Sequence, residues 1–141
     1  MKYLSFENAY LLRLEKGEEV TETLLGFCKK MTIRSGWVIA IGASDFLETG
    51  FFDTAEKKYH RQTFEGLHEI APLTGNIAIR EGEPMLHLHI TFAGPDLISR
   101  SGHLFRAIVN PTLEVKIECS PNPWKRSYDA STGLYLLDFP D

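Results

Sequence analysis

The sequence is poor in several features that mark whole classes of protein. Its 141 residues hold only two cysteines, Cys28 and Cys119, which stand far apart and form no CxxC arrangement. A buried pair of thiols is the simpler interpretation, and a disulfide has no support from this spacing. No apolar run approaches the ~20 residues of a membrane span, and no charged-then-apolar leader follows Met1. These absences predict a cytoplasmic protein with no membrane partner.

Positive charge is also scarce, and it is not clustered. Fifteen Lys and Arg stand against nineteen Asp and Glu, which gives a net charge of −4 and a pI of about 5.7. Such a chain has no overall positive field that would recruit DNA or an anionic membrane. The motifs GxGxxG, GxxxxGK and GxSxG are missing as well. No nucleotide cofactor and no serine or cysteine nucleophile is therefore indicated.

The pattern of apolar residues predicts many strands and one helix. A length of 141 residues with 43% hydrophobic residues suits a single domain over residues 1–141. Helical spacing over about residues 18–34 places five side chains on one apolar stripe, namely Val20, Leu24, Phe27, Cys28 and Met31. Turn residues, together with the alternation of apolar and polar side chains, divide most of the remaining sequence into β-strands. We expect an α+β fold, a mostly antiparallel and strongly bent β-sheet with one main α-helix.

Two further segments carry specific expectations. Residues 37–41 form a short apolar run that ends at Gly42, which is typical of a strand buried on both faces. Residues 124–131 follow two prolines and show no clear period, so this segment is expected to be irregular.

The most informative stretch covers residues 83–109 and holds three of the five histidines. Leu86, Leu88 and Ile90 alternate with His87 and His89, so the two histidines share the polar face of one strand. A Gly-Pro-Asp turn at residues 94–96 then reverses the chain. If residues 93–97 form the loop, His87 falls opposite His103 and three imidazoles converge. A single bulge would instead send His103 to the other face.

Three imidazoles in this arrangement match a metal site. His87, His89 and His103 could supply three nitrogens to Zn²⁺ or another divalent ion and leave a fourth position open for water. The alternative is that they are partly buried histidines at a subunit interface, bonded to the backbone or to Glu114.

An ordered set of blocks over nearly the whole chain resembles the PPC domain family, which is shared by plants and prokaryotes. The blocks are residues 13–19, 39–43, 51–53, 69–70, 73–78, 82–84, 87–89, 102–104 and 112–115. The resemblance implies a largely antiparallel fold, a homotrimer and an association with DNA. The DNA association rests on plant members that carry AT-hooks, and no Arg-Gly-Arg-Pro hook occurs here.

The resemblance also adds residues to the candidate site. Its Thr-x-Glu block makes Glu114 a candidate general base or a partner that orients the histidines, whereas the sequence alone favours a solvated strand face for this residue. Gly42, Gly75 and Asn76 become candidates for lining a small pocket, while turn or bulge geometry is the alternative for the glycines.

Three functions stay open at this point. The first is a trimeric metal-binding protein, with hydrolase- or lyase-like activity on a small metabolite. The second is a DNA-associated regulatory module, which the acidic charge and the missing hook disfavour. The third is a non-catalytic binding scaffold with structural histidines.

Overall fold

The computed structural model describes residues 1–139, and β-strands make up most of them. The elements in chain order are β1 (Lys2–Ser5), β2 (Ala9–Glu15), α1 (Val20–Met31), β3 (Gly36–Asp53), β4 (Lys58–Arg80), β5 (Glu83–Ala93), β6 (Ser99–Cys119), β7 (Lys125–Asp129) and β8 (Leu134–Leu137).

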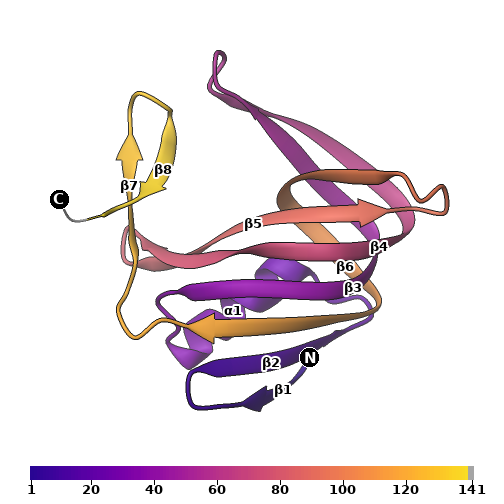
Figure 1. Cartoon of the computed structure of the whole chain (residues 1–141), viewed down its shortest axis with the longest axis horizontal. Coiled ribbons are helices and arrows are strands. Elements are labelled where there is room, and N and C mark those ends of the chain that lie inside the picture. The colour runs from indigo at the N-terminus through magenta and orange to yellow at the C-terminus, as the bar shows by residue number, and fades with distance from the viewer. Residues whose placement is uncertain (140–141) are drawn as a thin grey trace.

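The strands form one sheet that curls back on itself. Its order is β1-β2-β6-β3-β4-β7-β8, and β5 lies off this path because it pairs with both β4 and β6. The long strand β6 bonds to β5 near its start and to β3 and β2 along its remaining length. In Figure 1 the upper parts of β3 and β4 rise above the other strands as a long hairpin. All strand pairs are antiparallel except β4 with β7, which confirms the mostly antiparallel sheet.

The single helix covers the inner face of this sheet (Figure 1). It is shorter than the predicted 18–34, because the Glu19 side chain caps its start by accepting from the Glu22 N–H. Thr32 ends it with a left-handed backbone, φ 56°. Its buried side chains, Val20, Leu24, Phe27 and Cys28, pack into the core formed by the inward residues of β2 to β6. No helix within residues 1–139 is long and apolar enough to cross a membrane.

Both cysteines are free thiols, and Cys28 is buried. Burial, together with the nearby Cys119, raises the pKa of the Cys28 thiol to about 12. The expectation of buried thiols without a disulfide therefore fits Cys28 well, while Cys119 is only partly buried.

Two expectations from the sequence are wrong. The start of β3 is buried on one face only: Trp37, Ile39 and Ile41 are 58%, 51% and 57% exposed, while Val38 and Ala40 lie in the core. The error arises because an apolar run does not say whether solvent or protein covers its second face. Most of residues 124–131 is not irregular either, since Lys125–Asp129 form β7, which pairs with β4 and with β8.

Candidate metal centre

The predicted histidine hairpin exists, with a different register. His89, not His87, lies opposite His103, and Phe92 pairs with Arg100. The prediction was wrong because the loop covers residues 94–98 instead of 93–97, as Ala93 pairs with Ser99. A shift of two residues keeps every side chain on its face. The three histidines therefore still converge.

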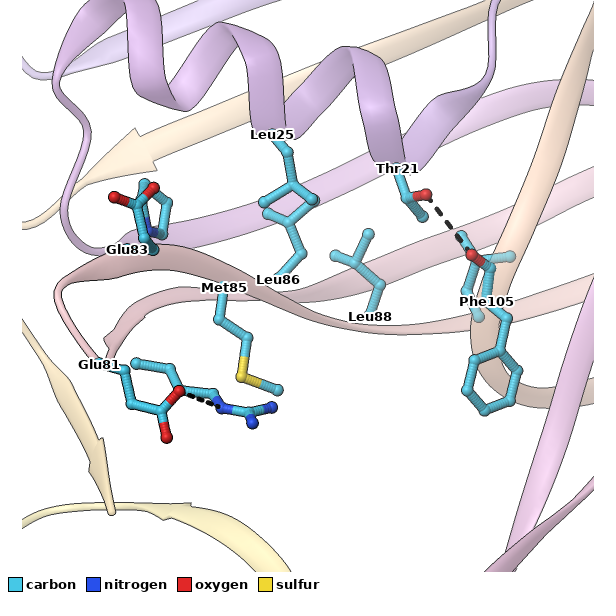
Figure 2. Close-up of a pocket in the computed structure, with 11 residues that line it drawn as sticks. Thr21, Leu25, Glu81, Glu83, Met85, Leu86, Leu88 and Phe105 are labelled. Atoms are coloured by element: carbon cyan, nitrogen blue, oxygen red, sulfur yellow. Dashed lines mark hydrogen bonds and ion pairs between the residues drawn. The ribbon is translucent and has the colours of Figure 1, made fainter. Parts of the chain in front are cut away.

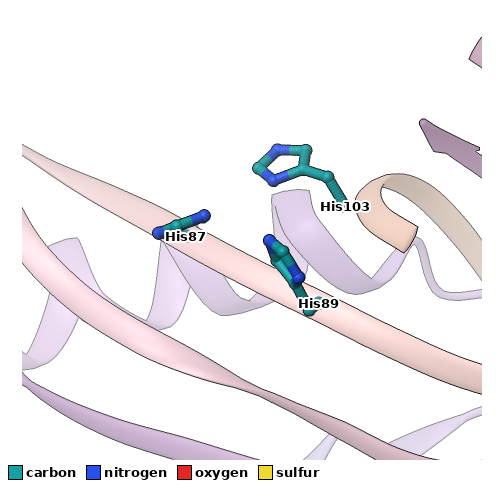
Figure 3. Close-up of side chains that lie close together, drawn as sticks. All are labelled: His87, His89 and His103. Atoms are coloured by element: carbon teal, nitrogen blue, oxygen red, sulfur yellow. The ribbon is translucent and has the colours of Figure 1, made fainter. Parts of the chain in front are cut away.

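The three rings form one compact group on β5 and β6 (Figure 3). Their centroids are 5.1 Å apart for His87–His89, 5.3 Å for His87–His103 and 5.5 Å for His89–His103. One ligand nitrogen from each ring lies within 4.8 Å of the others. His89 is exposed and the other two are partly buried. The group thus lies at the surface with one open side.

Aromatic packing holds His103 against the long β3–β4 hairpin. The rings of Tyr59 and Phe105 lie 5.0 Å and 4.9 Å from the His103 ring. Arg61 stacks over the Phe105 ring at 3.7 Å. These contacts fix the orientation of a histidine whose Nδ1 is buried and has no hydrogen-bond partner within residues 1–139.

Electrostatics keep at least two of the imidazoles neutral. Burial lowers the pKa of His103 to about 4, with smaller contributions from His87, His89 and Arg61. Burial also lowers the pKa of His87, assisted by the nearby positive charge of Arg126. Metal ions bind the neutral form of imidazole. Both side chains are therefore in the ligand-competent form at neutral pH.

The structure adds a residue that the sequence analysis missed. Arg126 of β7 is only 8% exposed and reaches the histidines from the C-terminal hairpin. Its Nη2 donates to Asn76 Oδ1 at 2.9 Å and lies 3.3 Å from His87 Nδ1. Its Nη1 donates to the Tyr135 carbonyl at 2.8 Å. No local motif marks this residue, because its partner Asn76 is 50 positions away in the chain.

Gly75 and Asn76 lie beside His87, as the family blocks suggested. Asn76 is the direct cross-strand partner of His87, and Gly75 is the partner of Leu88. A Cβ at Gly75 would overlap the His87 carbonyl oxygen and come within 2.8 Å of Leu88 Cα. The glycine therefore lets β4 approach β5 closely at the histidine pair. Its predicted role in lining a pocket remains a prediction.

Gly42 has a different explanation. It lies at an irregularity in the pairing of β3 with β4, and its φ is +149°. A Cβ here would overlap the Thr112 carbonyl oxygen of β6. Close backbone approach and a bulge account for this glycine.

Glu114 lies apart from the histidines within one chain. It is exposed in the second half of β6, where it pairs with Arg13 and Ile41. It borders a groove over β1 and β2. Among residues 1–139 no hydrogen bond or ion pair joins it to a histidine. Its predicted role as a general base or orienting partner stays a prediction that would need a second copy of the chain.

Two other features are separate from the histidine group. A cavity of about 450 Å³ lies between α1 and the open edge of β5, with Thr21, Leu25 and Leu88 among its lining residues (Figure 2). A second group of ligand-type side chains, Asp53, Glu56 and His60, lies at the exposed tip of the β3–β4 hairpin. Those side chains already contact one another and Lys58.

The donor set at the histidines fits a borderline divalent ion. Tetrahedral zinc with imidazole nitrogens at ~2.1 Å holds those nitrogens roughly 3.4 Å apart. Ligand atoms that already lie within 4.8 Å need only small side-chain rotations to reach this spacing. His103 Nδ1 is buried and has no hydrogen-bond partner within residues 1–139, and a bound ligand such as a metal ion would explain such an atom.

The protein is thus a curled antiparallel sheet that carries a three-histidine group on its surface. The chain belongs to the Plants and Prokaryotes Conserved (PCC, or PPC) domain family, whose model matches residues 1–119. The resemblance found in the sequence is thus confirmed. Comparison with functionally curated proteins gives no match.

Solved structures of similar proteins share the whole fold. A "putative DNA binding protein" from Bacteroides thetaiotaomicron is 36% identical, with a TM-score of 0.95, over 98% of this chain and 96% of that chain. A protein named in the same way from Ralstonia eutropha is 28% identical, with a TM-score of 0.92, over 99% and 96%. The metal-containing protein AF0104 from Archaeoglobus fulgidus is 30% identical, with a TM-score of 0.86, over 99% and 100%.

Proposed function

We propose that this protein binds a divalent metal ion, with zinc as the best match, through His87, His89 and His103. The observation that carries the proposal is that one ligand nitrogen from each of the three imidazoles lies within 4.8 Å of the others, with no acidic side chain in the group. The lowered pKa values of His87 and His103 support it, since both rings are ready to coordinate. The metal content of the similar archaeal protein points the same way.

A metal ion with three histidine ligands would have an open coordination position, and this favours a reaction at the ion. Three neutral ligands leave the charge of the ion uncompensated, so a bound ion would acidify a water molecule or polarise a carbonyl group. The exposed His89 leaves one side of the group accessible. A hydrolase- or lyase-type reaction on a small metabolite is the activity that suits this arrangement.

We further propose that the protein works as a homotrimer, as its family resemblance implies. Support comes from the exposed apolar side chains Trp37, Ile39 and Ile41 on β3. Trp37 and Ile39 pair with Asn76 and Thr74 of β4, which pair in turn with His87 and His89. Exposed apolar patches of this kind are typical of protein interfaces. A neighbouring copy on this face would enclose the histidine group.

The test is elemental analysis of protein purified without a His-tag, combined with its mass in solution. We expect about one divalent ion per chain, as for a mononuclear three-histidine site. The double variant His87→Ala/His89→Ala should lose the ion and keep its fold and mass. The matched control His60→Ala, at an exposed histidine outside the group, should keep the ion. Wild-type protein without metal that takes up no added zinc would refute the site. Collapse of the assembly in the double variant would instead assign the histidines a structural role.

DNA binding is the second candidate, and the names of the Bacteroides and Ralstonia proteins favour it. The net charge of −4 argues against tight nonspecific binding. A titration with duplex DNA at several salt concentrations decides the question. An affinity that falls steeply with salt supports a DNA-binding module, and no binding at low salt rejects it.

A further inference from the structure

Arg126 is a buried cation with no acidic partner. It makes no ion pair with a carboxylate within residues 1–139, whereas Arg61, Arg80 and Arg100 all do. Its neutral contacts are the Asn76 side chain, the Tyr135 carbonyl and His87. Its Nε is buried and has no partner in the described part of the chain. A buried charge is costly without an opposite charge, so this guanidinium lacks an anion.

The contact between Arg126 and His87 cannot persist in a metal-loaded site. A guanidinium only donates, so His87 Nδ1 must present its lone pair to Nη2. A neutral histidine that binds metal through Nε2 carries its proton on Nδ1, which would then face the arginine donor. A histidine that binds through Nδ1 uses the same lone pair for the ion. In either case, metal binding removes the acceptor from Arg126.

The loaded site would therefore have excess positive charge and free donors. The ligand group contains histidines only, so no carboxylate offsets the divalent ion and the arginine. Nε and Nη2 lie on one edge of the guanidinium, the fork that binds a carboxylate through two parallel hydrogen bonds. Asn76 and Tyr135 hold this fork next to His87. The excess positive charge and the free N–H donors of Arg126 both favour an anion at the open coordination position of the metal ion.

We propose that the site binds a small carboxylate, held between the metal ion and the guanidinium of Arg126. This inference rests on the proposed metal site, and it defines the chemical class of the ligand. Arg126 lies on β7, beyond the residues 1–119 that the family model matches. The C-terminal hairpin of β7 and β8 thus supplies the group that selects an anionic ligand.

The experiment uses the full chain loaded with Co²⁺, whose visible spectrum reports ligands at a zinc-type site. Sodium acetate is titrated at constant ionic strength, with acetamide as the neutral isostere. Wild type is compared with Arg126→Gln and Arg126→Met, which remove the charge. The matched control is Arg80→Gln, because Arg80 is the cross-strand partner of Arg126 and stacks on Tyr135. Circular dichroism checks the fold of each variant.

We expect acetate to shift the Co²⁺ spectrum of wild type and of Arg80→Gln with the same Kd. Both Arg126 variants should bind Co²⁺ and bind acetate at least tenfold more weakly, while acetamide should cause little change in any protein. Equal acetate affinities in wild type and the Arg126 variants would overturn the proposal and leave the metal site standing. A lack of any acetate response in wild type would also overturn the proposal and leave the metal site standing. A carboxylate of a second copy that occupies the fork would give this result.

Absence of Co²⁺ binding in wild type would defeat the metal site and this proposal together. If neither uncharged variant folds, Arg126→Lys replaces them, because lysine keeps the charge and loses the fork. Weaker acetate binding by this variant than by wild type supports the proposal, and an unchanged Kd overturns it.

Discussion

The partly buried His103 of the candidate site should make the metal-free protein sensitive to mild acid. The folded protein holds the pKa of His103 at about 4, mainly through burial, and an unfolded histidine has a pKa of ~6.5. A depressed folded pKa means that the unfolded chain binds the proton first as the pH falls. The stabilisation from a neutral His103 is therefore complete above pH ~6.5 and is lost as the pH falls toward 4.

The size of this effect follows from the two pKa values. Between pH 7 and pH 5, the linkage relation gives a loss of about 2 kcal/mol from this side chain. With an unfolding entropy of ~2.1 cal/mol/K per residue, a chain of this length loses roughly 6 °C in Tm. Carboxylates elsewhere also titrate in this range, so the relevant quantity is a difference between two proteins.

The assay compares thermal unfolding of metal-free wild type and His103→Gln at pH 7 and pH 5. Glutamine cannot titrate, so the Tm of the variant should fall less between the two pH values, by roughly 6 °C. Its Tm at pH 7 is a separate quantity and does not enter the comparison. Equal decreases in both proteins would show that His103 is not held neutral by burial, and would refute the electrostatic description of the site.

Three further changes test the geometry around the site. Gly75→Ala should lower the free energy of unfolding by ~1–3 kcal/mol, because the added Cβ meets the backbone of β5. Gly26→Ala, at an open position of the helix, should raise the free energy of unfolding by up to ~1 kcal/mol. Thermal melts compare the two variants. Glu19→Ala should cost ~0.5–2 kcal/mol in denaturant unfolding, since it removes the cap of α1, and no loss would contradict the cap. Ile39→Glu should reduce the solution mass toward a monomer, whereas Phe51→Glu, at an exposed apolar residue near the other end of β3, should not; the same result for both would reject an interface at Trp37, Ile39 and Ile41.

Local patterns were sufficient for much of the fold. Alternation over residues 85–92 placed His87 and His89 on one face, and the structure keeps them there. Helical spacing located α1 to within three residues at each end. The convergence with His103 survived an error in the position of the loop, because the resulting register shift of two residues preserved the faces.

Features that depend on distant partners could not be predicted in this way. Arg126 joins the site only because β7 pairs with β4, which is a contact between segments far apart in the chain. Trp37 and Ile39 belong to an apolar run typical of a fully buried strand, and yet both side chains are exposed in the part of one chain that the structure describes, residues 1–139. Sequence pattern reports that a side chain is apolar, but the tertiary and quaternary contacts decide what covers it.

X-ray absorption spectroscopy at the zinc edge, on protein prepared without a His-tag and supplied with zinc, tests the central claim most directly. The account predicts three nitrogen ligands at about 2.0–2.1 Å with the outer-shell pattern of imidazole, together with one further light-atom ligand. The imidazole pattern should vanish in His87→Ala/His89→Ala. A spectrum with sulfur ligands, with oxygen ligands alone, or unchanged in that double variant would contradict it.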